Sequence, residues 1–252
     1  MSCSIDRDAL LQALDRELEP GRFQDGCPNG LQVEGRREIR RIVSGVTASQ
    51  ALITAAIDQG ADLILAHHGY FWRGEAQPVT GMKRLRLQAL LQHQINLVAY
   101  HLPLDAHPQL GNNAQLARRL GLLVDGPLRE DGIGLVGRLP EARSAAAVAD
   151  QIEAALGRPP LWISGGAHPV LRMAWCTGGA QSLLLVAAAA RVDAFISGEI
   201  SEQTTHEARE LGIHYFAAGH HATERYGVWA LGDWCAERFG LEHRFIDIPN
   251  PA

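Results

Sequence analysis

The chain has 252 residues, of which 46% are hydrophobic and 20% charged, and its formal net charge of −5 disfavours a main role in gripping nucleic-acid phosphates. Four cysteines without a Cys-x-x-Cys pair exclude a disulfide framework or zinc ribbon and favour a reduced, cytoplasmic location. The N-terminus lacks signal-peptide blocks, and the longest apolar run, Leu183 to Ala190, is far shorter than the ~20 residues of a membrane span.

Predicted helices and strands alternate along the first half of the chain. Leu10, Leu11 and Leu14 are spaced as in a helix over residues 5–18, which ends at Pro20-Gly21. An extended segment at 31–33 precedes five more predicted elements. These are a strand at 41–46, a helix at 47–59 capped by Ser49, a strand at 62–66, a helix at about 82–93 and a strand at 95–99. Such alternation predicts parallel strands with crossover helices.

The stretch 129–140 is rich in glycine and charge, and it is the best candidate for a domain boundary. An alanine-rich helix is predicted at 142–156, ended by Gly157. We therefore predict an α/β fold of two interlinked domains, the first formed by residues 1–128 and 220–252 and the second by residues 129–219.

A duplicated β-α-β unit is the second prediction about the fold. Residues 41–68 align without a gap with residues 172–199, at an offset of 131 residues. Both segments follow the order strand, helix, aspartate, strand, and the aspartates are Asp62 and Asp193. We interpret these two aspartates as structural and expect a metal site between the two halves.

Histidines and carboxylates follow several predicted strands. His67 and His68 end the apolar run 61–66, and His101 and Asp105 follow the strand at 95–99. The second half supplies three more side chains at comparable places, which are Glu199, His220 and Glu224. Ligands bind parallel α/β sheets at the carboxyl ends of the strands, so we expect these side chains to converge.

Imidazole and carboxylate donors suit Zn, Mn, Fe or Ni, and there are enough of them for two ions. His220 and Glu224 are four residues apart, so on a helix they would share one face. Glu224 is the preferred bridge between the ions, and a metal-bound hydroxide would be the nucleophile. Glu199 is either a ligand or the acceptor that orients a ligating imidazole. The remaining histidines are interpreted as ordinary, with His107 the closest alternative, and they are His93, His107, His168, His206, His214, His221 and His243.

Several motifs together resemble the dinuclear metal-centre hexameric family, whose members are commonly labelled GTP cyclohydrolase 1 type 2 homologs. The resemblance is closest to bacterial YbgI-like proteins and runs from near residue 5 to the C-terminal segment. The motifs are Pro28-Asn-Gly-Leu-Gln-Val33, Gly45-Val-Thr-Ala-Ser-Gln50, His67-His-Gly-Tyr-Phe-Trp72, His101-Leu-Pro-Leu-Asp-Ala106, Ser197-Gly-Glu199 and Gly219-His-His-Ala-Thr-Glu224.

The resemblance implies a toroidal homohexamer with two divalent ions per chain. It implies that His67, Asp105 and Glu224 bind one ion. It also implies that His68, His220 and Glu224 bind the other, so that Glu224 bridges them. His101 matches a motif histidine of the family and is a further candidate ligand. His221 stands where many relatives carry an aromatic residue, and this departure leaves His220 in place.

Two functions remain open from the sequence. The first is a metal-dependent hydrolase resembling GTP cyclohydrolase 1 type 2, which acts on a nucleotide or a cyclic amide. The second is a non-enzymatic metal-binding ring that binds a partner or nucleic acid, with basic residues at 36–41 and 83–86 as its contact surface. The low overall charge disfavours nucleic acid as the partner, and a fold or site does not by itself fix the substrate.

Overall fold

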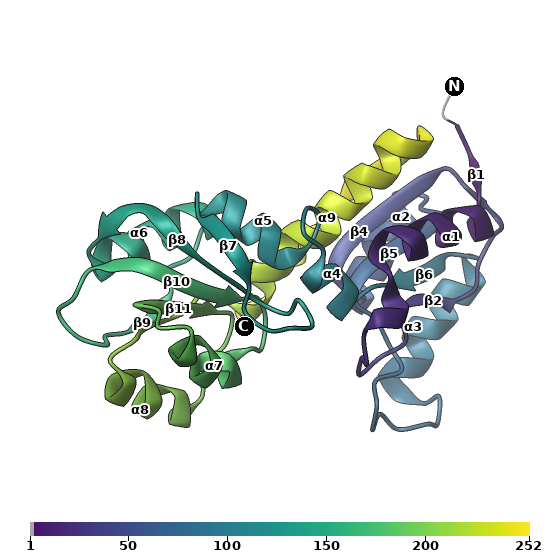
Figure 1. The fold of residues 1–252 in the computed structure, drawn as a ribbon. Helices are drawn as coiled ribbons and strands as arrows, with labels where there is room; N and C mark the ends of the chain where they lie inside the picture. Colours follow the sequence, from purple (N-terminus) through teal and green to yellow (C-terminus); the bar gives the residue numbers. More distant parts are fainter. Residues whose placement is uncertain (1–2) are drawn as a thin grey trace. The chain divides into compact units, whose positions relative to one another are not determined.

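The computed structural model describes residues 3–252. The chain forms two compact units, each built from two stretches of sequence. Unit 1 consists of residues 3–104 and 227–248, and unit 2 of residues 105–226 and 249–252. Both are α/β structures, which confirms the predicted fold class (Figure 1).

Unit 1 is built on a five-stranded sheet. In the order in which they pair, its strands are β13 (Glu242–Phe245), β4 (Arg41–Thr47), β5 (Leu63–His68), β6 (Asn96–Ala99) and β2 (Gly30–Val33). All neighbours are parallel except β2, which pairs antiparallel with β6. The other elements are β1 (Ile5–Asp6), α1 (Arg7–Leu18), η1 (Pro20–Arg22), β3 (Glu38–Ile39), α2 (Gln50–Asp58) and α3 (Gly81–Gln92).

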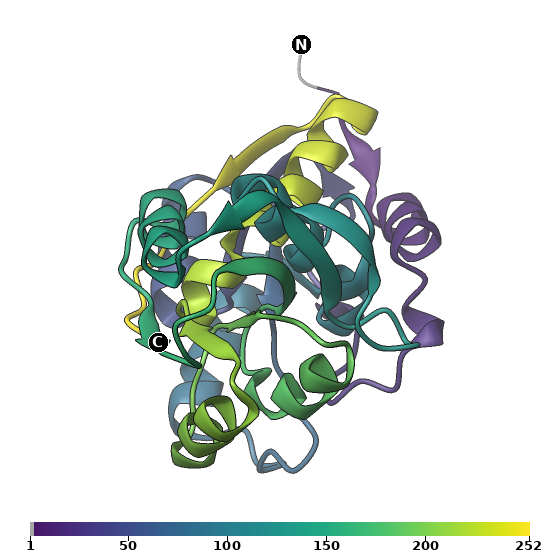
Figure 2. The same cartoon turned by 60° about the vertical axis from the view of Figure 1, so that its left-hand side comes forward.

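Unit 2 is built on a six-stranded sheet. Its strands pair in the order β7 (Leu123–Pro127), β8 (Leu135–Arg143), β10 (Val170–Cys176), β11 (Ala194–Ser197), β12 (His214–Ala217) and β9 (Leu161–Ile163). The helices are α5 (Asn112–Arg119), α6 (Ala145–Leu156), η2 (Gln181–Leu183), α7 (Leu184–Ala189) and α8 (Glu202–Leu211). Helices α7 and α8 lie on one side of this sheet and α6 on the other (Figures 1 and 2).

Two helices contain the points where the chain passes from one unit to the other. The short α4 (Leu102–Ala106) spans the division at 104/105, and α9 (His220–Phe239) spans the division at 226/227. The predicted boundary near residue 129 instead falls inside unit 2. The glycine- and charge-rich stretch there forms the connection and the second strand of the β7–β8 hairpin. A hairpin connection uses the same residue types as a linker between domains.

The predicted duplication is visible in the pairing of the strands. Parallel β4, β5 and β6 correspond to parallel β10, β11 and β12, and each set ends in an antiparallel edge strand, β2 or β9. The crossover helices α2 and α3 correspond to α7 and α8. Equivalent helices and strands therefore occupy equivalent places in the two units.

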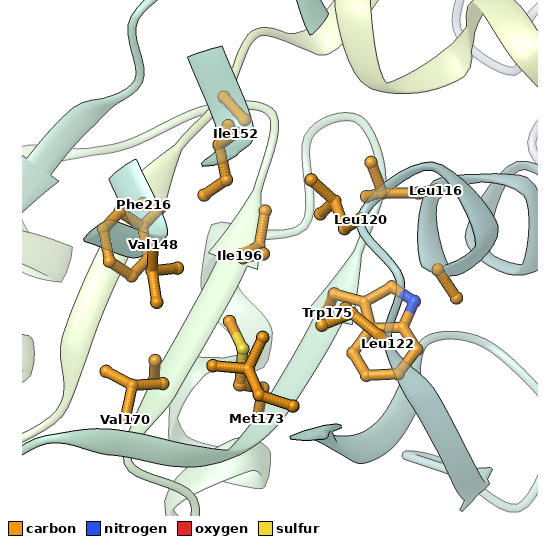
Figure 3. Close-up of a cluster of buried hydrophobic side chains, with 14 of the residues drawn as sticks. Leu116, Leu120, Leu122, Val148, Ile152, Val170, Met173, Trp175, Ile196 and Phe216 are labelled. Atoms are coloured by element: carbon orange, nitrogen blue, oxygen red, sulfur yellow. The ribbon is translucent and has the colours of Figure 1, made fainter. Parts of the chain in front are cut away.

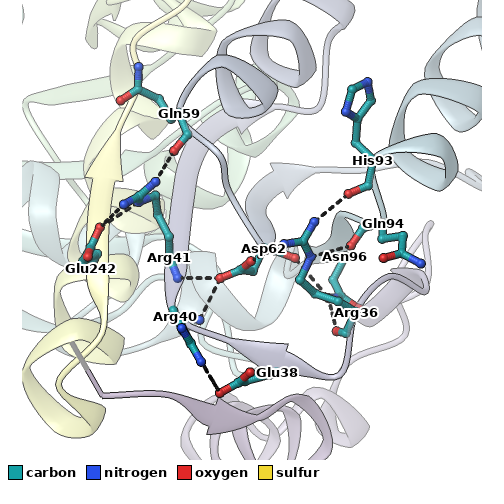
Figure 4. A network of polar contacts seen from close by, with 10 residues as sticks. All are labelled: Arg36, Glu38, Arg40, Arg41, Gln59, Asp62, His93, Gln94, Asn96 and Glu242. Carbon is teal, nitrogen blue, oxygen red and sulfur yellow. Dashed lines mark hydrogen bonds and ion pairs between the residues drawn. The ribbon is translucent and has the colours of Figure 1, made fainter. Parts of the chain in front are cut away.

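The aspartates of the repeat make the same hydrogen bonds in both units. Asp62 Oδ2 accepts from the backbone N–H groups of Arg40 and Arg41, at 2.8 and 2.9 Å (Figure 4). Asp193 Oδ2 accepts from the N–H groups of Leu171 and Arg172, at 2.9 and 2.8 Å. Each carboxylate thus supplies the acceptor for two backbone N–H groups at the start of a strand, so both aspartates have the structural role that the sequence suggested.

Apolar residues of the strands pack against the helices and form the buried core of each unit. In unit 2, Met173 and Trp175 of β10 pack with Val148 and Ile152 of α6, and Ile196 of β11 joins them (Figure 3). In unit 1 a cluster lies under α2 and α3, the equivalents of α7 and α8, and it includes Val43, Leu52, Ile53, Ile64, Leu90 and Leu97. Such burial is the main force holding each sheet to its helices. Among residues 3–252, every helix is too short or too polar to cross a membrane.

Candidate metal centre

Unit 1 gathers three imidazoles at the carboxyl ends of its central strands. His67 and His68 are the last two residues of β5, and His101 follows β6. One potential ligand atom from each lies within 4.8 Å of the other two. The ring centroids of His67 and His68 are 4.5 Å apart, and that of His101 is 5.0 Å from His67. The strand ends therefore bring these predicted site residues together within one unit.

Each of the three rings is held at Nδ1 by a different group. His67 Nδ1 donates to the carbonyl oxygen of Tyr100 at 3.0 Å, and His68 Nδ1 contacts Oγ1 of Thr47 at 3.2 Å. His101 Nδ1 lies 2.7 Å from Oδ1 of Asp25. Metal-binding histidines are usually oriented in this way through the nitrogen that does not bind the ion. The cluster thus fits a divalent cation, with Nε2 as the donor atom of each ring.

Asp25 is a site residue that the sequence did not indicate. Its side chain is only 4% exposed. Burial acts to raise its pKa, but the hydrogen bonds with His101 and Asn29 outweigh burial and hold the pKa well below the usual range of a carboxyl group. Asp25 is therefore an ionised carboxylate at neutral pH.

Aromatic cover lies beside the same histidines. The ring of Trp72 stands edge-on to His101, with centroids 5.0 Å apart, and its centroid is 6.1 Å from that of His68. Its indole Nε1 donates to the carbonyl oxygen of Gly69 at 3.2 Å, which fixes the ring. Trp72 restricts the rotation of His101 and shields one side of the cluster from water.

Unit 2 gathers carboxylates. Asp105 is 7% exposed, and its Oδ1 accepts from Asn112 Nδ2 at 2.8 Å and from Thr177 Oγ1 at 3.4 Å. Glu224 is 3% exposed, and one of its oxygens lies within 4.8 Å of an oxygen of Asp105. Two buried carboxylates this close together repel each other unless a cation compensates them, so this pair also fits a divalent ion.

His220 lies between two carboxylates at the start of α9. Its Nε2 is 3.1 Å from Oε2 of Glu224, one helical turn away, and its Nδ1 donates to Oε1 of Glu199 at 2.7 Å. Burial acts to lower the pKa of His220, but the two carboxylates outweigh it and raise the pKa to about 9. The predicted i, i+4 pair does share one helix face, and Glu199 orients the imidazole.

Gly178 leaves room for this group. It has a φ of +68°, and a Cβ atom there would overlap the carboxylate of Glu224 and come within 3.1 Å of Nε2 of His220. Its N–H donates to Oγ1 of Thr223 at 3.0 Å. Only glycine fits a position with both this φ and this close approach. The packing of His220 and Glu224 therefore requires glycine at position 178.

Most of the other histidines have ordinary hydrogen-bonding roles. His107 Nδ1 accepts from the N–H of Leu110 at 2.9 Å, which closes a turn. His243 bridges Ser44 and Asp233, at 2.7 and 2.8 Å. In unit 2, Nδ1 of His214 accepts from the N–H of Gly165 at 3.1 Å. These contacts give each of the three imidazoles hydrogen-bonding partners within its own unit.

Apart from Glu199, the side chains that orient the predicted ligands were not indicated by the sequence. In unit 1 they are Asp25, Thr47 and Asn29, and in unit 2 they are Asn112 and Thr177. Asp25 is separated from His101 by 76 residues of sequence. The signal that could have found it is the turn-forming Asp25-Gly-Cys-Pro-Asn29 segment, which has polar residues at both ends.

The whole chain is similar to known proteins. Residues 5–251 match the family model described as Duf34/NIF3 (NGG1p interacting factor 3). A Pseudomonas aeruginosa protein named GTP cyclohydrolase 1 type 2 homolog is 58% identical, over 99% of this chain and 100% of its own. An Escherichia coli K12 protein of the same name is 53% identical, over 96% and 98% of the two chains.

Solved structures show the same fold. The structure of protein ybgI, described as being of unknown function, has a TM-score of 0.96 and 52% identity, and the match covers 98% of this chain and 100% of that one. A Thermus thermophilus protein has a TM-score of 0.91 and 38% identity, with the same coverage. Both matches span the two units, so the whole chain resembles these proteins.

Proposed function

This chain belongs to the Duf34/NIF3 family, and on that basis we propose that it is a hydrolase that uses two divalent metal ions. The observation that carries the proposal is the gathering of oriented donors in each unit. Unit 1 supplies His67, His68 and His101, and unit 2 supplies Asp105, His220 and Glu224. Relatives named GTP cyclohydrolase 1 type 2 homolog support a nucleotide or a cyclic amide as the substrate.

We assign the ligands as the family resemblance implies. His67, Asp105 and Glu224 would hold one ion, and His68, His220 and Glu224 the other, with Glu224 as the bridge. His101 would be an additional ligand in unit 1. Imidazole and carboxylate donors suit Zn, Mn, Fe or Ni. The hydroxyl of Thr223 is unsuited to the bridge, which needs two oxygen donors.

A divalent ion bound here would supply Lewis acidity and lower the pKa of a water molecule. The residues of the chain fix the donors in place for it. The carbonyl oxygen of Tyr100 holds the Nδ1 proton of His67, so the lone pair of a neutral ring is on Nε2. Asn112 orients Asp105, and Glu199 orients His220. Trp72 limits the access of bulk water to the histidines.

Elemental analysis of chelator-free protein, with a hydrolysis screen of nucleotides and cyclic amides, tests the proposal. We expect about two ions per chain and metal-dependent turnover. Glu224→Gln should lose the metal ions and the turnover, because an amide is a poor metal ligand and cannot bridge two cations. Glu210→Gln, at an exposed position of α8, is the matched control.

Full turnover by metal-free Glu224→Gln would contradict the hydrolase proposal. Less than one ion per chain after loading with Zn or Mn would contradict the ligand assignment. Metal binding without turnover, together with a salt-dependent shift on DNA, would favour the non-enzymatic role instead.

We also propose that the chain self-associates into a homohexamer, as the family resemblance implies. Light scattering coupled to size-exclusion chromatography measures this directly, since each chain has a mass of 27.4 kDa. A monomer at micromolar concentration would contradict the proposal.

A further inference from the structure

We propose that Asp25 is a positioning residue of the histidine cluster in unit 1. In this role it holds His101 with Nε2 directed to the same space as the donor atoms of His67 and His68. The inference rests on the proposed metal site and adds to it a residue from the loop before β2. Because Asp25 contacts His101 and would not contact the ion, it acts through the imidazole.

The protons around Asp25 determine the tautomer of His101. The N–H of Gly26 donates to Oδ1 at 2.6 Å, the N–H of Leu102 donates to Oδ2 at 2.9 Å, and Asn29 Nδ2 donates to Oδ2 at 3.0 Å. All these partners are donors, so the carboxylate acts only as an acceptor. Nδ1 of His101 must therefore carry the proton in the 2.7 Å contact, and the lone pair of a neutral ring is left on Nε2.

The loop also fixes the position of His101 in a second way. Asn29 Oδ1 accepts from the backbone N–H of His101 at 2.8 Å. Because Asn29 Nδ2 also donates to Asp25, the side chain of Asn29 links Asp25 to the backbone that follows β6. The side chain of Asp25 is 4% exposed and that of His101 is 20% exposed. Water therefore has little access to replace the carboxylate if it is removed.

The three histidines differ in the charge of the group that holds them. Tyr100 offers a neutral carbonyl to His67, and Thr47 offers a hydroxyl to His68, whereas Asp25 offers a charged acceptor to His101. Hydrogen bonds to an ionised acceptor are roughly twice as strong as neutral ones. A carboxylate partner also makes the imidazole a better donor to a metal ion. Asp25 is therefore the anchor whose loss should weaken this cluster most.

Zinc affinity measured against a chromophoric chelator tests the inference without any substrate. Asp25→Asn should bind Zn²⁺ about 10–100-fold more weakly than the wild type, which is the usual effect of losing such an orienting group. Asp233→Asn is the matched control, because Asp233 holds Nδ1 of His243 at 2.8 Å in the same unit, and it should keep wild-type affinity. His101→Ala should weaken binding, and adding Asp25→Asn to it should cause little further loss.

The tautomer of His101 in the metal-free wild type provides a second measurement that needs no variant. Long-range ¹H–¹⁵N correlation NMR at pH 8 should show the proton on Nδ1. A proton on Nε2 would overturn the inference, and so would wild-type zinc affinity in a folded Asp25→Asn protein. A wild type that binds zinc but hydrolyses nothing contradicts the hydrolase proposal and leaves this inference standing.

Discussion

Units 1 and 2 share one scaffold but carry different chemistry at the ends of their strands. The last two residues of β5 are His67 and His68, and the aligned positions after β11 are Gly198 and Glu199. Unit 1 thus presents mainly nitrogen donors, whereas unit 2 presents mainly carboxylates. The shared hydrogen bonds of Asp62 and Asp193 lie at the opposite, amino ends of the strands. The residues at the carboxyl ends of the strands therefore differ between the units, whereas the structural hydrogen bonds at the amino ends are the same.

The aspartates test this equivalence with the largest expected effect. Asp62→Ala should lower the free energy of unfolding of unit 1 by about 3 kcal/mol, because two backbone N–H groups lose their acceptor. Asp193→Ala should cost about 2 kcal/mol in unit 2. The difference arises because Asp62 is 7% exposed and also pairs with Arg36 Nη1 at 3.0 Å, while Asp193 is half-buried.

Hydrogen exchange followed by mass spectrometry measures these costs, since peptides from each unit report its own stability. Each substitution should increase exchange mainly in its own unit. Equal costs, or a larger cost for Asp193→Ala, would show that the two hydrogen-bond networks are not graded by burial.

Asn96 and His214 are a second pair of equivalent residues, and they should give the stabilities of the two units different pH dependences. Asn96 Oδ1 accepts from the N–H of Gly35 at 2.8 Å, and His214 Nδ1 accepts from the N–H of Gly165 at 3.1 Å. Burial lowers the pKa of His214. Below about pH 6.5, His214 therefore binds a proton more readily in the unfolded chain than in folded unit 2. The stability that neutral His214 contributes is present above this pH and is lost as the pH falls through the folded pKa.

His214→Asn should make unit 2 resemble unit 1 at this position. We expect a loss of about 1–2 kcal/mol at pH 7, since the hydrogen bond from Trp162 and some packing disappear. The fall in stability of unit 2 between pH 7 and 5 should become shallower. Denaturant unfolding across this range tests the prediction, with exposed His206→Asn as the control. An unchanged slope would mean that His214 does not titrate differently on folding.

The smallest effect is expected at the start of the first crossover helix. Ser49 caps α2 by accepting the N–H of Leu52 at 3.2 Å, and the equivalent residue in unit 2 is Ala180, where the helix begins with a 3-10 turn. Ser49→Ala should cost about 1 kcal/mol. Thermal unfolding measures it, and Ser49→Asp, which keeps an acceptor, should retain most of the stability. An equal loss in both variants would exclude capping as the cause.

The repeat and the ligand types were predictable because they depend on local spacing. The spacing and length of the apolar runs predicted where the strands lie. The four-residue spacing of His220 and Glu224 predicted that they share one helix face. Apart from Glu199, the orienting residues were not predictable in this way, because Asp25 and Thr47 reach their histidines from distant loops and strand ends. The boundary near residue 129 failed because the composition of a hairpin turn resembles that of a linker. Pairing partners are set by tertiary packing, which short patterns do not record.

The interleaving of the two units has a consequence for biosynthesis. Strand β13 pairs with β4, although Glu242 and Arg41 are 201 residues apart in sequence. While the chain emerges from the ribosome, the β4 edge of the unit 1 sheet lacks its neighbour until residues 242–245 have been made. An unpaired strand edge invites association with other nascent chains. We therefore expect the growing polypeptide to depend on chaperones more than the finished protein does.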